Sequence, residues 1–443
     1  MSEARPDVGG FRAAYEALVR RDGAPGWLRE RRRLGWERFE RLGLPTTKDE
    51  AWRFTSVAPI ARSLFEVPGA VGVDAEGRAL VSWLRFGAPC ALVFVNGRHS
   101  PQLSCPWPDD SVRLTTVAEL MRTEPGRIET LLGRGANGSS SSFLALNDAM
   151  LDDGACVVIG AGRVVATPIS VVFFETSRGG QPVAAHPRVL ILAERGSQAT
   201  VVEAYGGVPG EHYLTNGVSE VRLEEGAILD HVRVQRESEA AFHTASLAIH
   251  QARASRYRSI AFDLGAALAR TDIDVVLDGE GAECELDGLF IVDGERLSDS
   301  HTTINHARPH TTSRETYRGI VDSHGRGVFH GRIVVQPDAQ KTDALQLNKN
   351  LVLSPTALVN STPQLEIRAD DVRCKHGSTT GQIDPQALFY LRSRGISEQA
   401  ARSLLTYAFA GDIVGRVKIE AVRQAVGALL RERLPAAPEE AIL

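Results

Sequence analysis

The stretch RYRSIAFDLGAALARTDIDVVLDGEGA, residues 256–282, decides the fold of this chain. It contains two short runs in which apolar and polar residues alternate, and a period of two is typical of a β-strand with one buried face. The apolar members of these runs are Ile260 and Phe262, then Ile273 and Val275. Gly265-Ala266 and Gly281-Ala282 follow the runs, and glycine beside a small residue is typical of a turn. The stretch therefore predicts two short strands, each followed by a turn.

The same pattern continues on both sides of this stretch. Further alternating runs lie at Val189 to Leu192, Val221 and Leu223, Val232 and Val234, Leu247 and Ile249, and Ile333 and Val335, with turns at Gly196-Ser197 and Gly226-Ala227. A sandwich, a barrel and a parallel β-helix all contain short strands with frequent turns. An imperfect repeat of this length is more than one sandwich needs. We therefore predict a mainly β protein whose core, residues 151–384, is a parallel β-helix, or solenoid.

The residues before this core predict an α+β segment, residues 1–150. Phe11 to Leu44 has the apolar spacing of helices, and apolar alternations between Val71 and Val95 predict strands that end at the turn dipeptide Asn96-Gly97. Residues 133–142 (GRGANGSSSS) lack apolar periodicity, which is typical of a loop or linker. We therefore place a domain boundary near residue 150.

The residues after the core, 385–443, predict a helical domain. Asp384-Pro385 has the pattern of a helix start, and Gly395 can end that helix. Ser397 is a second N-cap, and the following apolar residues have helical spacing on both sides of an expected break at Gly411. We expect two amphipathic helices to close the chain, so that helical parts flank the solenoid at both ends.

Composition narrows the classes of function. The 50 Lys and Arg residues against 55 Asp and Glu give a charge of -5, so the chain has no overall positive field to hold nucleic acid. The basic run at residues 29–33 (RERRR) is expected to cover a solvated helix face. No apolar run has the length of a membrane span, and the first residues, MSEARPDVGG, do not have the pattern of a secretory signal. Five widely separated cysteines favour free thiols and a cytoplasmic protein.

The familiar catalytic motifs are absent from the sequence. It contains no G-x-x-x-x-G-K-[ST] loop and no G-x-G-x-x-G that opens a helix, so any step driven by ATP must belong to a partner. It also lacks a G-x-S-x-G elbow and an H-E-x-x-H pair. We therefore do not expect this chain to be an enzyme.

Three groups of residues remain as candidates for chemistry. His301, His306 and His310 resemble a metal cluster, but their spacing in strands puts them on different faces. Asp370 and Asp371 could serve an enzyme that cleaves an acidic polysaccharide, although neighbouring strand residues point to opposite faces and turn residues are the commoner explanation. Cys374 and His376 are two residues apart, so in a strand both project from one face, where thiolate and imidazole suit iron, zinc or sulfur. A buried cysteine beside a surface histidine is the alternative.

The segment from Arg314 to Ile396 resembles the core of the SufB/SufD family of iron-sulfur cluster assembly proteins. The resemblance rests on SRETYRG (313–319), VFHGRIVVQPDAQKTDALQLNKNLVLS (328–354), PQLEIRADDVRCKHGSTTGQID (363–384) and ALFYLRSRGI (387–396). PTTKDEAWRFT (45–55) and Leu146-Asn147 with Ala149 also resemble family motifs. These segments are more similar to the SufD branch than to the SufB branch, and together they span most of the chain.

The resemblance implies a right-handed parallel β-helix that pairs with a SufB-like paralogue and binds a SufC-like ABC ATPase through its C-terminal helices. ATP would then act only through SufC. The implied chain binds no stable cofactor alone, and iron or an iron-sulfur cluster would be held transiently at the SufB interface. The residues expected to dock the ATPase are Leu404, Leu405, Tyr407 and Phe409.

By the same resemblance, His376 matches the SufD histidine implicated in building the cluster, and Cys374 matches the cysteine two residues before it. The region from Pro337 to Asn350 has no cysteine where SufB-like chains carry their essential one, and Gly377 replaces their glutamate. We therefore expect this chain not to be the main sulfur acceptor. Two alternatives stay open: a β-helix enzyme acting on an acidic polysaccharide, and a homodimeric adaptor of the same fold.

Overall fold

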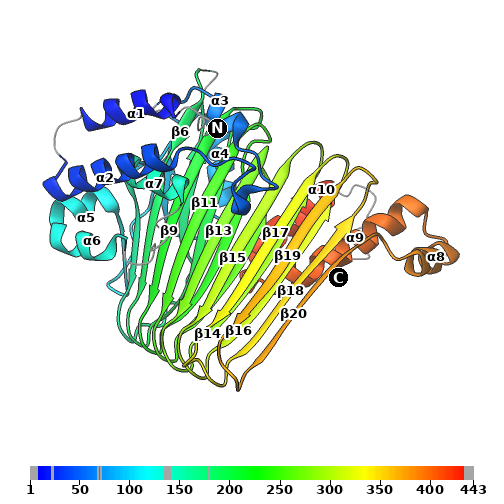
Figure 1. Cartoon of the computed structure of the whole chain (residues 1–443). Coiled ribbons are helices and arrows are strands. Elements are labelled where there is room, and N and C mark those ends of the chain that lie inside the picture. Colours follow the sequence, from blue (N-terminus) through cyan, green and yellow to red (C-terminus); the bar gives the residue numbers. More distant parts are fainter. Residues whose placement is uncertain are drawn as a thin grey trace.

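The computed structural model is a parallel β-solenoid formed by two facing sheets, with helices near both ends of the chain (Figure 1). It describes residues 8–20, 24–66, 69, 72–133, 141–177 and 180–433. In spatial order, the first sheet contains β2 (Arg98–His99), β1 (Ala91–Val95), β5 (Ile169–Glu175), β8 (Gln198–Gly207), β10 (Ile228–Arg236), β12 (Arg256–Asp263), β14 (Glu283–Val292), β16 (Thr312–Val321), β18 (Asp343–Val352) and β20 (Arg373–Gly381). The second contains β19 (Leu358–Ile367), β17 (Arg326–Val335), β15 (Leu297–His306), β13 (Leu268–Leu277), β11 (Phe242–Gln251), β9 (Tyr213–Leu223), β7 (Arg188–Ala193), β4 (Gly154–Ile159) and β3 (Val112–Thr116), with β6 (Val183–Ala185) beside β9.

The chain alternates between the two sheets, so from β8 onward each strand pairs in parallel with the strand two places later. Ile228 of β10, for example, lies between Gln198 of β8 and Arg256 of β12. One coil therefore takes roughly 30 residues and contributes one strand to each sheet. The predicted mainly β solenoid is confirmed.

The decisive stretch forms β12 and β13 and buries apolar residues on two different faces. Ile273 and Val275 of β13 point between the sheets, into the core of the solenoid. Ile260 and Phe262 of β12 point outward and pack beneath the C-terminal helices. Ala266 and Gly281 have positive φ angles, of 66° and 69°, in the turns that follow the two strands. The predicted strands and turns are therefore confirmed.

The C-terminal helices are α8 (Pro385–Ser393), α9 (Glu398–Val414) and α10 (Glu420–Arg433). The side chain of Asp384 caps α8 by accepting a hydrogen bond from Gln386 N, and Ser397 caps α9 by accepting one from Ala400 N. The expected break at Gly411 is wrong, because α9 continues to Val414. Ile413 and Val414 bury their side chains against the outer face of the first sheet, and this packing outweighs the weak helix propensity of one glycine.

The N-terminal part contains α1 (Gly9–Val19), α2 (Gly26–Leu42), a 3₁₀ turn (Glu50–Trp52), α3 (Ala58–Arg62), α4 (Ala75–Leu84), α5 (Val117–Thr123), α6 (Pro125–Leu131) and α7 (Ser142–Met150). The expected strands between Val71 and Val95 are wrong for α4, which starts at the N-cap Asp74 and packs Val81 and Leu84 against the outer face of the first sheet. Residues 134–140 of the predicted linker lie outside the described residues. This part also contributes strands to the solenoid, because β1 belongs to the first sheet and β3 belongs to the second. The domain boundaries at residues 150 and 384 stay predictions.

The basic run on α2 is only partly solvated, which corrects the sequence-based expectation. Arg32 is 4% exposed and donates to the carbonyl oxygen of Leu151, while Arg31 pairs with Asp148 at 2.8 Å. Asp148 also pairs with the fully buried Arg188 of β7. The run therefore fastens α2 to α7 and to the solenoid. In the described part of the chain, no helix is both long and apolar enough to cross a lipid bilayer.

Candidate functional site

The solenoid ends in a coil whose two strands, β19 and β20, contain no buried residue. In the described residues β20 pairs with β18 alone and β19 pairs with β17 alone, so each strand has one edge without a neighbouring strand. Most residues of β20 are exposed, whereas residues of β18 alternate between buried and partly exposed. Figure 1 shows this end of the solenoid in yellow and orange, with α8 projecting beyond it. We call the exposed surface of β19 and β20 the open end.

Cys374 and His376 lie on β20 and share the face that the two-residue spacing predicts. They pair in register with Ala344 and Gln346 of β18, both of which are buried between the two sheets. Ser378 continues the row, and its hydroxyl donates to the hydroxyl of Ser361 on β19 at 2.7 Å, across the end of the solenoid. The row therefore faces the interior of the last coil, where no further coil covers it in the described structure.

The two candidate residues differ in environment. The Cys374 thiol is half-buried against the cluster that contains Ile333, Val335 and Ala344. This burial raises the pKa of the Cys374 thiol above its ordinary value, so the sulfur keeps its proton at neutral pH. His376 is exposed, and in the described part of the chain its imidazole has no hydrogen-bond partner, although its backbone pairs with β18. One side chain is thus a packed thiol, and the other is an accessible imidazole.

A polar row leads inward from His376. Gln346 occupies the same position one coil earlier, and its amide donates to the Glu315 carboxyl at 2.6 Å. Burial raises the pKa of the Glu315 carboxyl to about 7, although the hydrogen bond from Gln346 acts in the opposite direction. The sequence-based search missed this row. The row could have been recognised in the sequence from two pairs of residues spaced two apart, Glu315 with Tyr317 and Gln346 with Asn348. These residues stand at positions where the other strands carry apolar core residues.

The three candidate histidines are dispersed, as their spacing predicts. His301 lies on the outer face of the second sheet, 3.0 Å from the Asp299 carboxylate, and stacks on His330. His306 is buried between Thr311 and Ser313, and His310 is an exposed turn residue. Among the described residues, no three His, Cys, Asp or Glu side chains are placed to hold a metal ion together.

The two candidate carboxylates lie in an exposed bend between β19 and β20. Asp371 forms an ion pair with Lys341, and its backbone N–H donates to the Gln340 side chain. Both carboxylates are exposed in this bend, which fits the turn residues that the sequence analysis gave as the commoner explanation.

The residues expected to dock an ATPase are only partly exposed to solvent. Leu404, Leu405, Tyr407 and Phe409 are all half-buried on α9. Tyr407 and Phe409 pack toward the first sheet, and the Arg318 guanidinium lies 4.8 Å from the Phe409 ring. The sequence-based search missed two more accessible aromatic side chains on α8, Phe389 and Tyr390, which are 74% and 56% exposed. In the sequence, these two residues stand out as adjacent aromatic residues. In the structure, the helix that carries them has no buried residue.

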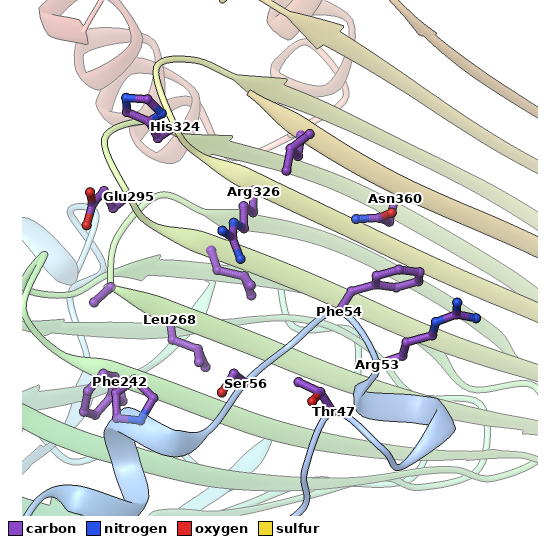
Figure 2. Close-up of a pocket in the computed structure, with 14 residues that line it drawn as sticks. Thr47, Arg53, Phe54, Ser56, Phe242, Leu268, Glu295, His324, Arg326 and Asn360 are labelled. Atoms are coloured by element: carbon purple, nitrogen blue, oxygen red, sulfur yellow. The ribbon is translucent and has the colours of Figure 1, made fainter. Parts of the chain in front are cut away.

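A separate cavity of about 920 Å³ lies on the outer face of the second sheet. Figure 2 shows Arg53 and Phe54 of the N-terminal segment beside the strand residues Arg326 and Asn360, and all four line the cavity. These strand residues point away from the interior row, because they alternate with residues that face the core. The cavity therefore lies on the opposite face of the second sheet from the interior row, although Leu358 and Asn360 of β19 line it.

Comparison with known proteins assigns the chain to a family. Residues 173–409 match the family model described as the SUF system FeS cluster assembly, SufBD core domain. An iron-sulfur cluster assembly SufBD family protein of Synechocystis is 35% identical over 394 residues, with 86% of each chain covered. The iron-sulfur cluster assembly protein SufD of Escherichia coli is 30% identical over 400 residues, covering 89% of this chain and 90% of that protein. SufD of Bacillus subtilis is 25% identical over 424 residues, covering 93% and 94%. The matched core includes Cys374, His376 and the open end, and this chain belongs to the SufBD family of iron-sulfur cluster assembly proteins.

Proposed function

We propose that this chain is a SufD-type subunit of an iron-sulfur cluster scaffold and pairs through its open end with a SufB-like paralogue. A SufC-like ATPase binds its C-terminal helices and supplies ATP hydrolysis, so this chain is not itself an enzyme. The nascent cluster is cargo that forms between the two paralogues. The five free cysteines suit a reducing compartment, and we place the assembly in the cytoplasm.

The observation that carries this proposal is the pair Cys374 and His376 on an uncovered coil. Unpaired strand edges tend to recruit another chain, and a parallel coil is completed by a similar coil stacked on it. A paralogue with the same solenoid supplies such a coil. Pairing would bury the row of Cys374, His376 and Ser378 between the two proteins.

The donor count also favours a shared site. An iron-sulfur cluster usually takes four protein ligands, and the open end of this chain offers one thiol and one imidazole on the same face. The remaining ligands must come from the partner or from small molecules. His376 is the better iron ligand because it is exposed, whereas Cys374 is half-buried and protonated at rest. We assign Cys374 the role of an accessory thiol.

A test of the pairing is the substitution Ser378→Arg. Ser378 is exposed in the single chain, so a large charged side chain is tolerated there before assembly. On pairing, the same charge would be buried without a partner, which is strongly unfavourable. Co-expression with a SufB-like and a SufC-like partner from the same genome, followed by affinity purification of this chain, should recover roughly tenfold less paralogue from the variant than from wild type.

Lys375→Ala is the matched control, because Lys375 neighbours this row on the same strand but projects from the opposite face. It should leave recovery of the paralogue unchanged. Undiminished recovery with Ser378→Arg would contradict pairing through the open end. If wild type instead recovers a second copy of itself and no paralogue, the homodimeric adaptor replaces the heterodimer.

A further inference from the structure

Two cysteines far from the open end lie close together near the start of the first sheet. The Sγ atoms of Cys90 and Cys105 are 3.5 Å apart. Cys90 directly precedes β1, and Cys105 belongs to the segment that returns alongside β1 after β2. The other three cysteines lie on β4, β14 and β20, so this is a specific pair of thiols.

Backbone hydrogen bonds hold this pair in place. Cys105 N donates to the carbonyl oxygen of Ala91 at 2.9 Å, and Ser100 N donates to that of Val93 at 2.8 Å. The Ser104 hydroxyl also accepts a hydrogen bond from Val93 N. These contacts fix the returning segment against β1, so the two sulfur atoms stay close together without a covalent bond.

The two thiols differ in access. Cys90 is 8% exposed, whereas Cys105 is half-buried and lines a cavity of about 650 Å³ together with His99, Glu119 and Arg122. A small oxidant can therefore reach Cys105 first, and Cys90 lies behind it within reach of the oxidised sulfur. An accessible thiol beside a second, resolving thiol is the usual arrangement of a reversible redox pair.

We propose that Cys90 and Cys105 form a reversible intramolecular disulfide when a small hydroperoxide is present. The Cys105 thiolate attacks the peroxide oxygen, the O–O bond breaks, and hydrogen peroxide yields a sulfenic acid and one water. Cys90 then attacks the sulfenic sulfur, forms the S–S bond and displaces a second water. Two thiols are oxidised and one peroxide is reduced. The product fastens the segment after β2 covalently to the start of β1.

The sequence allows a direct test by peptide mapping. Trypsin cleaves after Arg85, Arg98 and Arg113, so Cys90 and Cys105 fall in separate peptides, residues 86–98 and 99–113. The full-length chain is treated with one equivalent of hydrogen peroxide, alkylated and digested. We expect the two peptides to be joined, with a mass about 2 Da below their sum, and the free thiols to fall from five to three. A thiol reductant should reverse both changes.

Two variants make this result specific. Cys90→Ser should abolish the cross-link and leave a sulfenic acid on Cys105 that dimedone traps. Cys374→Ser keeps the proposed pair and should form the cross-link to the same extent as wild type. Alkylation of both peptides as separate species after peroxide treatment would overturn the proposal, as would a cross-link between two molecules through Cys105.

Discussion

At the scale of single residues, the chemistry available to an inward-facing side chain depends on whether a further coil covers it. Glu315, Gln346 and His376 occupy the same position in three successive coils of the first sheet. Glu315 and Gln346 are buried and bound to each other, whereas His376 is exposed because the coils end there. A histidine one coil earlier would be a core residue. The place of His376 in the row therefore makes it available to a partner.

Glu315 should make the stability of the protein depend on pH. Its pKa is raised to about 7 in the folded chain against an ordinary value near 4.5, so the folded state holds a proton that the unfolded state releases between these values. Its contribution to the free energy of unfolding is present below about pH 4.5 and is lost as pH rises through about 7. The loss is roughly 3 kcal/mol when 1.36 kcal/mol is taken per pKa unit.

Glu315→Gln removes this titration and keeps the shape of the side chain. Urea unfolding between pH 5 and pH 8 should therefore show a smaller loss of stability in the variant than in wild type, and the difference isolates Glu315 from other buried acids such as Glu175 and Asp263. If the two proteins lose the same free energy of unfolding over this range, Glu315 is ionised in the folded chain.

At the scale of elements, α8 is unusual because it carries large aromatic side chains on an exposed surface. It carries Phe389 and Tyr390 on its surface, and none of its residues is buried. The adjacent α9, in contrast, buries Ala401, Ala410 and Ile413. Exposed aromatic side chains on a projecting helix are typical of a protein-binding surface. We therefore extend the proposed ATPase-docking surface from α9 to α8.

Replacing both Phe389 and Tyr390 with alanine should weaken binding of the SufC-like ATPase by roughly tenfold or more, because aromatic residues often dominate interface energy. The melting temperature should change little, since both side chains are exposed in the single chain. Binding is measured by calorimetry with the purified ATPase. Phe54→Ala, which removes an aromatic residue that is 43% exposed on another part of the surface, is the control. Equal affinity of the double variant and wild type would exclude α8 from the docking surface.

Local sequence patterns predicted the elements whose structure depends on local interactions. Alternating runs and small-residue turns identified β7, the strands from β9 to β13, and β17, and Asp384 and Ser397 marked two helix starts. The patterns failed where the structure depends on contacts between residues that are far apart in the sequence. Gly411 stays helical because α9 packs on the first sheet, and Arg32 is buried because Leu151, far away in sequence, accepts its hydrogen bond. The shared face of Cys374 and His376 followed from spacing, but their exposure did not, because it depends on where the coils end.

At the scale of the whole molecule, the two ends of the solenoid differ. The first coils are covered by α2, α5, α6 and α7, whose apolar residues pack against the early strands (Figure 1). The last coil leaves β20 largely exposed and β19 partly exposed, with the candidate thiol and imidazole facing its interior. At the first end, β1 is buried and β3 has no exposed residue, so the last coil is the more accessible place for a similar coil to continue the solenoid. We therefore propose that the cluster is assembled where this last coil meets the partner.

The most direct test of this claim is the anaerobic visible absorption spectrum of the assembly purified with SufB-like and SufC-like partners. Three assemblies are compared, containing wild type, His376→Ala, or Lys375→Ala as the control on the opposite face of β20. We predict that all three assemblies form, and that cluster absorbance falls by roughly tenfold with His376→Ala alone. An intact His376→Ala assembly with the full wild-type chromophore would contradict a role for the open end in holding the nascent cluster.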